Sequence, residues 1–143
     1  MPQVSKVALV SYSAKQMFDL VVDINKYPEF LPWCDSSQVF SNQDQIITAS
    51  LGVNYHGVKQ KFTTQNQYEP GDYLNMKLLE GPFEYLDGVW HFIKLKDNAC
   101  KVDFSLKFKF NNIILEKIAS KVFLQIANTM LDSFIQRAKE IYG

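Results

Sequence analysis

Residues 112–142, NIILEKIASKVFLQIANTMLDSFIQRAKEIY, decide how this chain folds. Apolar residues recur every three or four positions from Leu115 to Ile141, with charged and amide side chains between them and neither proline nor glycine. This spacing predicts an amphipathic helix with one side facing the protein interior. At about 1.5 Å per residue, the helix would be roughly 45 Å long. It therefore needs a large apolar surface, which the preceding residues have to supply.

The stretch 37–110 predicts that surface, because its apolar residues recur at every second position, most strictly at 102–110. Turn signals at 70–72, 81–82 and 97–98 mark three of the breaks in the stretch, in which about six strands are expected. Around Trp90 both faces are apolar, so the pattern does not assign the inward face. With a further strand predicted at 3–11, short connections give a curved antiparallel sheet of about seven strands.

Two short helices are expected after the first strand. Ser13 and Gln16 have the spacing of a capping box, which predicts a helix start. The segment 27–34, YPEFLPWC, then places apolar residues between two prolines, which predicts a rigid elbow that covers part of the core. We therefore predict an α+β fold, a single domain over 1–143, in which the sheet grips the long C-terminal helix.

Composition excludes several classes of function. Lysine and arginine balance aspartate and glutamate at 15 each, so no DNA partner is expected. No apolar run suits a signal peptide or a membrane span, and a cytoplasmic protein with reduced Cys34 and Cys100 is expected. His56 and His91 have no ligand-type neighbours at metal-site spacing, so no metal is predicted. No nucleophile–base pair is visible, so we expect no enzyme.

A straight helix and a curved sheet do not fit flush, so a cavity between them is expected. The residues predicted to line it, and to bind an apolar ligand there, are Phe30, Trp33, Gln60, Phe62, Thr64, Met76, Trp90, Phe104, Phe108, Val122, Ile126, Met130 and Phe134. The alternative is that these side chains simply pack together as core. Inward amides and hydroxyls, including those of Gln60, Thr64 and Asn66, need partners, which each other, water or a ligand could provide.

Lysines follow the polar face of two predicted strands. They are Lys59, Lys61, Lys101, Lys107 and Lys109. They form either an ordinary solvated surface or a basic surface that docks RNA or a protein, and the sequence leaves both interpretations open.

Three stretches closely resemble the bacterial coenzyme-Q-binding START-like family: 1–34, the GPF at 81–83 followed by Gly88 and Trp90, and the ending VFLQIANTMLDSFIQRAKEIYG. The resemblance covers essentially the whole chain. The family motif corresponds to Tyr27, Pro28, Leu31, Pro32, Cys34, Gly81, Pro82 and Phe83. Trp33 stands where many relatives have a smaller residue, and we expect it to narrow the mouth of the pocket.

The resemblance implies a helix-grip (START/Bet v 1-like) domain of the polyketide cyclase and lipid transport type. It also implies two activities. In the respiratory branch, members bind ubiquinone and support its synthesis or delivery. In the toxin branch, members bind the large ribosomal subunit and block its association with the small one.

The leading hypothesis is a non-enzymatic protein that binds an isoprenoid lipid, most of all ubiquinone. We expect it to need no other cofactor and to contact membrane surfaces transiently. The alternative is a ribosome association inhibitor that uses the lysine surface.

Overall fold

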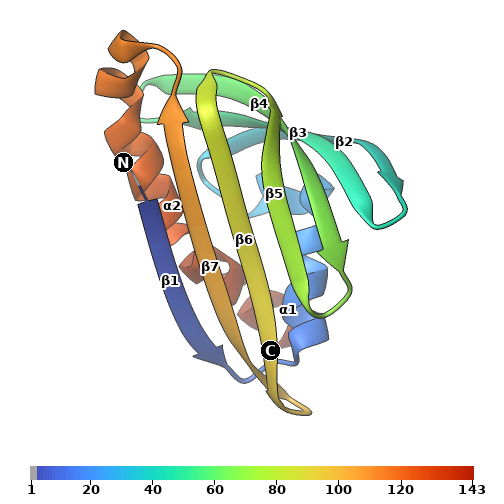
Figure 1. Ribbon diagram of the computed structural model, residues 1–143. Coiled ribbons are helices and arrows are strands. Elements are labelled where there is room, and N and C mark those ends of the chain that lie inside the picture. Colours follow the sequence, from blue (N-terminus) through green and yellow to red (C-terminus); the bar gives the residue numbers. More distant parts are fainter. Residues whose placement is uncertain (1–2) are drawn as a thin grey trace.

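The computed structural model describes residues 3–143, and its elements follow the predicted order (Figure 1). The elements are β1 (Gln3–Val10), α1 (Ala14–Val22), the 3-10 helix η1 (Ile24–Glu29), β2 (Cys34–Gln43), β3 (Ile46–Tyr55), β4 (Val58–Glu69), β5 (Tyr73–Glu80), β6 (Phe83–Lys96), β7 (Ala99–Phe110) and α2 (Ile113–Tyr142). The strands form one antiparallel sheet in the order β1-β7-β6-β5-β4-β3-β2. The sheet curves, and α2 lies against one of its faces (Figure 1), which confirms the helix-grip prediction.

The long helix α2 starts at a side-chain cap. Asn112 Oδ1 accepts hydrogen bonds from the backbone N–H groups of Ile114 and Leu115, at 2.8 and 3.1 Å, which satisfies two donors that the first helical turn leaves open. The buried side of α2 carries small alanines between large residues, so the helix lies close to the sheet. These buried residues are Ala119, Phe123, Ile126, Ala127, Leu131, Phe134 and Ala138.

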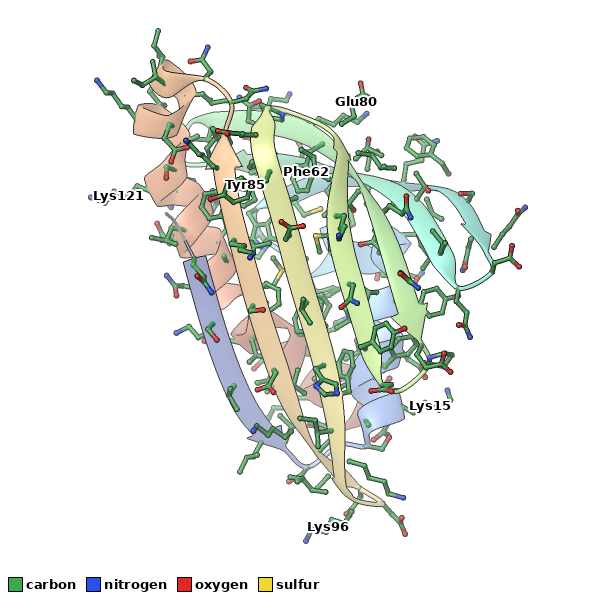
Figure 2. All side chains as sticks on the ribbon, viewed as in Figure 1. Lys15, Phe62, Glu80, Tyr85, Lys96 and Lys121 are labelled. Carbon is green, nitrogen blue, oxygen red and sulfur yellow. The ribbon has the colours of Figure 1, made fainter. Side chains whose placement is uncertain are left out.

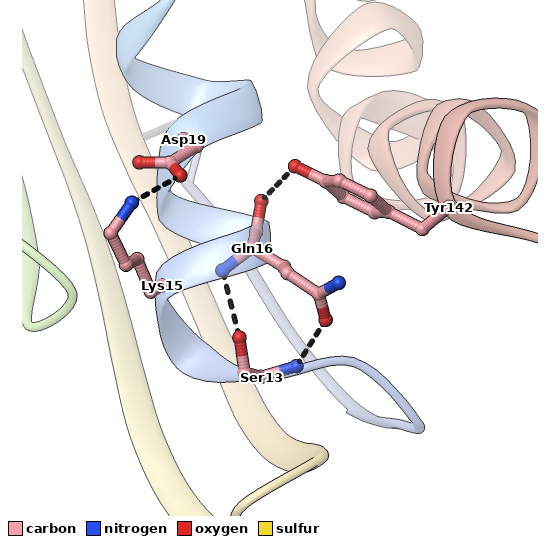
Figure 3. Close-up of polar contacts among 5 residues, drawn as sticks. All are labelled: Ser13, Lys15, Gln16, Asp19 and Tyr142. Carbon is pink, nitrogen blue, oxygen red and sulfur yellow. Dashed lines mark hydrogen bonds and ion pairs between the residues drawn. The ribbon is translucent and has the colours of Figure 1, made fainter.

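The predicted capping box is present at the start of α1. Ser13 Oγ accepts from the backbone N–H of Gln16 at 3.0 Å, and the Gln16 side chain accepts from the backbone N–H of Ser13 at 2.9 Å (Figure 3). The hydroxyl of Tyr142 donates to the backbone carbonyl of Gln16 at 3.0 Å. This contact ties the end of α2 to α1, so the two helices are fixed relative to each other across the open end of the sheet.

The orientation of β6, which the sequence left open, is set by its register. Trp90 pairs with Phe104 of β7 and with Leu74 of β5, and all three side chains are buried on the face toward α2. The neighbours of Trp90 in the chain, Val89 and His91, are exposed on the outer face. The Trp90 ring lies edge-on to Phe134 of α2, with centroids 5.1 Å apart, so sheet and helix meet directly at this point.

Two local predictions were wrong. The rigid elbow predicted at 27–34 does not start at Tyr27: Tyr27 and Pro28 belong to the 3-10 helix η1, because the fixed φ of proline is compatible with 3-10 geometry. The Tyr27 carbonyl accepts from Phe30 and Leu31, which closes the end of η1. The alternating pattern of the stretch 37–110 includes His56 in a strand, but this residue lies in the turn between β3 and β4 with a positive φ of 49°.

Candidate functional site

An apolar cavity lies between the sheet, the η1–β2 segment and α2. Its lining residues are Tyr27, Trp33, Leu51, Phe62, Met76, Leu86, Trp90, Phe104, Leu106, Phe123, Ile126 and Met130. Its volume is about 30 Å³, which is room for about one water molecule. The expected space is therefore present, but it is far smaller than the roughly 300 Å³ at which ordinary ligand pockets begin. A ligand can enter only if the walls move apart.

Seven of the residues predicted to line the cavity do so: Trp33, Phe62, Met76, Trp90, Phe104, Ile126 and Met130. Two of them, Met76 on β5 and Met130 on α2, are only partly buried. Long unbranched thioether side chains change conformation easily. These two side chains are therefore the parts of the wall that can move at the smallest energetic cost.

The other six predicted residues lie elsewhere: Phe30, Gln60, Thr64, Phe108, Val122 and Phe134. Phe30 is half-buried outside the cavity, beneath the guanidinium of Arg137, 4.9 Å from its ring centroid. Gln60 borders a surface groove near Gly52. Phe108 and Phe134 are fully buried but pack against other rings, and Val122 is partly buried against the core.

The inward polar residues of β4 satisfy one another. The Asn66 amide donates to the Thr64 hydroxyl and to the Ile47 carbonyl, both at 3.1 Å. Both Thr64 and Asn66 are buried. The sequence left open whether these groups are satisfied by each other, by water or by a ligand. In the structure they are satisfied by protein groups, so neither residue needs a ligand.

The sequence missed five lining residues: Tyr27, Leu51, Leu86, Leu106 and Phe123. Tyr27 had been singled out only as a motif residue. Gly88 lies between two lining residues of β6, and its missing side chain lets two further lining residues, Leu106 and Met76, pack over its backbone. A Cβ at Gly88 would lie 3.3 Å from Leu106 Cδ1 and 3.5 Å from Met76 Cβ.

The first motif segment turns its apolar residues inward. Tyr27, Leu31, Trp33 and Cys34 are buried, whereas Pro28 and Pro32 are exposed. The Tyr27 hydroxyl donates to the carbonyl of Val21, so this hydroxyl is already partnered.

The second motif segment, 81–83, holds the β5–β6 turn against the start of α2. A Cβ at Gly81 would lie 2.6 Å from the Cβ of Phe62, so only glycine allows this close approach. The Pro82 carbonyl accepts from the backbone N–H of Asn111 at 2.9 Å. The ring of Phe83 stacks on Phe110 with centroids 4.6 Å apart. The motif therefore packs directly against Phe62, a lining residue of the cavity.

The titratable groups near the cavity are held in their neutral forms. Burial raises the pKa of the Tyr27 hydroxyl. Burial, with a smaller contribution from the nearby charge of Asp35, raises the pKa of the Cys34 thiol to about 11. Cys34 is thus a protonated thiol near neutral pH, and it donates to the Ser36 carbonyl at 3.3 Å. Within residues 3–143, no three side chains of the metal-binding types come together as a ligand set.

Two buried polar atoms lack a hydrogen-bond partner in the part of the chain that the structure describes. They are Nε1 of Trp33 and Oγ of Ser37. No pattern in the sequence indicates which buried polar atoms lack a partner, because hydrogen-bond partners can be identified only once the fold is known.

The predicted lysines face outward but do not form one surface. Lys59 and Lys61 lie on β4, whereas Lys101, Lys107 and Lys109 lie on β7. Because β5 and β6 run between these strands, the two groups are three interstrand spacings apart, roughly 14 Å.

Acidic residues divide the lysines further. Lys109 pairs with Glu84 at 3.2 Å, and Asp87 of β6 stands opposite Lys107 in the register. Other lysines are equally dispersed, with Lys96 near the β6–β7 hairpin and Lys121 on α2 (Figure 2). The five predicted lysines therefore form two separate groups on the outer face, one on β4 and one on β7.

The fold and the cavity define a START-like helix-grip protein with an apolar interior site. The chain belongs to the family described as polyketide cyclase / dehydrase and lipid transport, whose model matches residues 10–135.

Two curated relatives carry different names. The ribosome association toxin RatA of Vibrio cholerae is 44% identical over 143 residues, which cover all of this chain and 99% of that protein. The mitochondrial coenzyme Q-binding protein COQ10 homolog B of Xenopus laevis is 28% identical, over 97% of this chain and 59% of that protein. Both names match the family that the sequence resembles, which confirms that prediction.

Among solved structures, the Zhui aromatase/cyclase from Streptomyces sp. R1128 has a TM-score of 0.81 at 14% identity. The match covers 99% of this chain and 95% of that one. At this identity the likeness shows the fold alone. In residues 3–143, no helix combines the length and the apolar character needed to cross a membrane.

Proposed function

We propose that this protein binds an apolar lipid with an isoprenoid tail, ubiquinone first among them, in the cavity between the sheet and α2. The observation that carries the proposal is the wall itself, in which apolar side chains from sheet, η1–β2 segment and helix converge on one enclosed space. Such a convergence is the usual form of a site for an apolar ligand. The similarity to a coenzyme Q-binding protein supports the same proposal.

Binding then requires the cavity to expand. A ligand that buries about 300 Å² of apolar surface gains roughly 7.5 kcal/mol at 25 cal/mol per Å². That gain offsets the rearrangement of partly buried side chains such as Met76 and Met130, which need not leave apolar surroundings to move aside.

The same proposal makes the protein a binder and not an enzyme. Tyr27 is the one titratable residue among the lining residues, and its hydroxyl is engaged by the Val21 carbonyl. Cys34 stands beside the site as a protonated thiol, which is a poor nucleophile.

Transient contact with a membrane surface belongs to this proposal, together with a cytoplasmic location. The first turns of α2 expose Ile113, Ile114 and Ile118 next to Lys117 and Lys121. Exposed apolar side chains beside lysines suit the surface of an anionic bilayer. Flotation with anionic vesicles measures this contact directly.

Mass spectrometry of lipid extracted from gently purified protein tests the main proposal. We expect an isoprenoid quinone in stoichiometric amount. A protein that carries no lipid, and that also fails to bind a short-tailed ubiquinone analogue in a calorimetric titration, would contradict it.

The second candidate is a ribosome association inhibitor, which the 44% identity to a ribosome association toxin supports over the full chain. The β7 lysines Lys101, Lys107 and Lys109 would then supply charge for contact with ribosomal RNA. Sedimentation with purified large ribosomal subunits, at low and at high salt, tests this candidate. Co-sedimentation that weakens with salt supports it, and a protein that stays in the supernatant at low salt rejects it.

A further inference from the structure

Two buried polar groups lack a partner at the same side of the cavity. Trp33 is only 3% exposed, and its indole N–H meets no acceptor in residues 3–143. The hydroxyl oxygen of Ser37 is buried and equally without a partner. Buried polar groups are nearly always satisfied in native proteins, so these two exceptions call for an explanation.

One of the two groups belongs to the cavity wall, and the register places the other next to a residue of that wall. Trp33 is one of its lining residues and immediately precedes β2. Ser37 of β2 stands opposite Leu51 of β3, which also lines the cavity. Directly paired residues of neighbouring strands project to the same face, so Ser37 projects to the cavity side of the sheet.

The hydroxyl of the wall already has a partner, because Tyr27 donates to the Val21 carbonyl. Trp33 contributes a fully buried donor without a partner to this largely apolar wall, at its β2–β3 side.

We propose that the Trp33 indole N–H, assisted by the Ser37 hydroxyl, hydrogen-bonds an oxygen acceptor on the head group of the ligand. In a quinone this acceptor is a ring carbonyl. The head group then lies at the β2–β3 side of the expanded cavity, and the tail lies along the apolar wall formed by Phe62, Phe104 and Ile126. This inference rests on the proposed function, because it assigns the residue that selects the head group of that ligand.

A bound water is the competing explanation. The cavity has room for about one water, and a buried water needs two to four polar partners, of which Trp33 in the wall and Ser37 next to it would supply two. If Trp33 only holds water, the protein should not discriminate between ligands with and without an acceptor oxygen. If Trp33 recognises the head group, the protein should prefer the ligand with the acceptor oxygen.

The experiment pairs Trp33→Phe with two ligands of equal tail length, a short-tailed ubiquinone analogue and an alkylbenzene without oxygen, in calorimetric titrations. Loss of ring area weakens both ligands by a common factor. Loss of the donor weakens the quinone analogue by about a further tenfold, since one buried hydrogen bond disappears. The ratio of the two affinities therefore isolates the hydrogen bond, as in a double-mutant cycle.

Trp90→Phe is the matched control, because it removes the same ring area from the same wall. It should change both affinities by one factor and leave their ratio as in the parent protein. Ser37→Ala removes only an unpartnered hydroxyl, so it can replace Trp33→Phe if that variant does not fold. We expect it to lower the ratio of quinone affinity to alkylbenzene affinity about threefold.

These titrations distinguish a failure of head-group recognition by Trp33 from a failure of lipid binding itself. If the parent protein binds the quinone analogue but neither Trp33→Phe nor Ser37→Ala changes the affinity ratio, this inference is overturned and the proposed function stands. If the parent protein binds neither ligand, both are refuted.

Discussion

Replacing Met130 with tryptophan tests whether the cavity is the ligand site. Met130 projects from the middle of α2 and is a lining residue of the cavity, where it is partly buried. The space available is about 30 Å³, so an indole in place of the thioether has no room unless it fills the volume into which a ligand would expand. The substitution should therefore block ligand binding without touching the outer face of the sheet.

The magnitude follows from the buried area. A ligand that buries about 300 Å² gains roughly 7.5 kcal/mol, and an indole that denies it a third of this area removes about 2.5 kcal/mol. That loss corresponds to about a 60-fold weaker affinity. Overpacking costs about 1–3 kcal/mol, which a domain of ordinary stability, about 5–15 kcal/mol, tolerates.

Calorimetric titration with a short-tailed ubiquinone analogue measures the affinity, and urea unfolding measures the stability. Met130→Leu, which conserves volume, is the control and should bind like the parent protein. Because a tryptophan at a partly buried position can turn outward, Leu106→Phe repeats the test from the fully buried sheet side. Parent-like affinity in both filled variants would show that the ligand binds elsewhere.

Three further predictions concern the helix cap, the lysines and the buried thiol. Asn112→Ala should lower the free energy of unfolding by about 1 kcal/mol, measured in urea, since two cap hydrogen bonds are lost; no change would mean that the cap is not formed in solution. The double substitution Lys107→Glu and Lys109→Glu should weaken co-sedimentation with large ribosomal subunits at low salt, more than at high salt, and spare quinone binding. Equal sedimentation of parent and variant would exclude the β7 lysines as the contact. Because burial raises the pKa of Cys34 from 9.0 to about 11, the folded state holds a proton that the unfolded state releases, so stability is unaffected below pH 9 and falls between pH 9 and 11. Cys34→Ala should lack this part of the fall, and an identical pH profile in urea unfolding would contradict the burial of the thiol.

The architecture could be predicted from the sequence because its strongest patterns are long. The unbroken three-and-four spacing of α2 and the strict alternation of β7 each extend over a whole element, so local exceptions do not hide them. Short elements are harder to predict. The prolines of the segment 27–34 indicated an elbow, yet a 3-10 helix accepts the fixed φ of Pro28.

The site was predictable only in part, because a pattern shows which side chains point inward and not which of them border a space. Phe108 and Phe134 point inward as expected, but the rings of Phe123 and Tyr27 pack directly against them. Phe123 instead reaches the cavity, although it lies on the same buried side of α2 as Phe134. The volume of the cavity and the unpartnered Trp33 N–H depend on packing among distant residues, which no local pattern contains.

The near-closure of the cavity has a kinetic consequence. If the protein admits a lipid only from a rare open conformation, its apparent affinity is reduced by the fraction of molecules that are open. The rate of loading should then level off as lipid concentration rises, at the rate at which Met76, Met130 and their neighbours separate. Conversely, the interior collapses behind a departing molecule and leaves no wet apolar hole, so closure helps to drive the unloading of cargo into an acceptor.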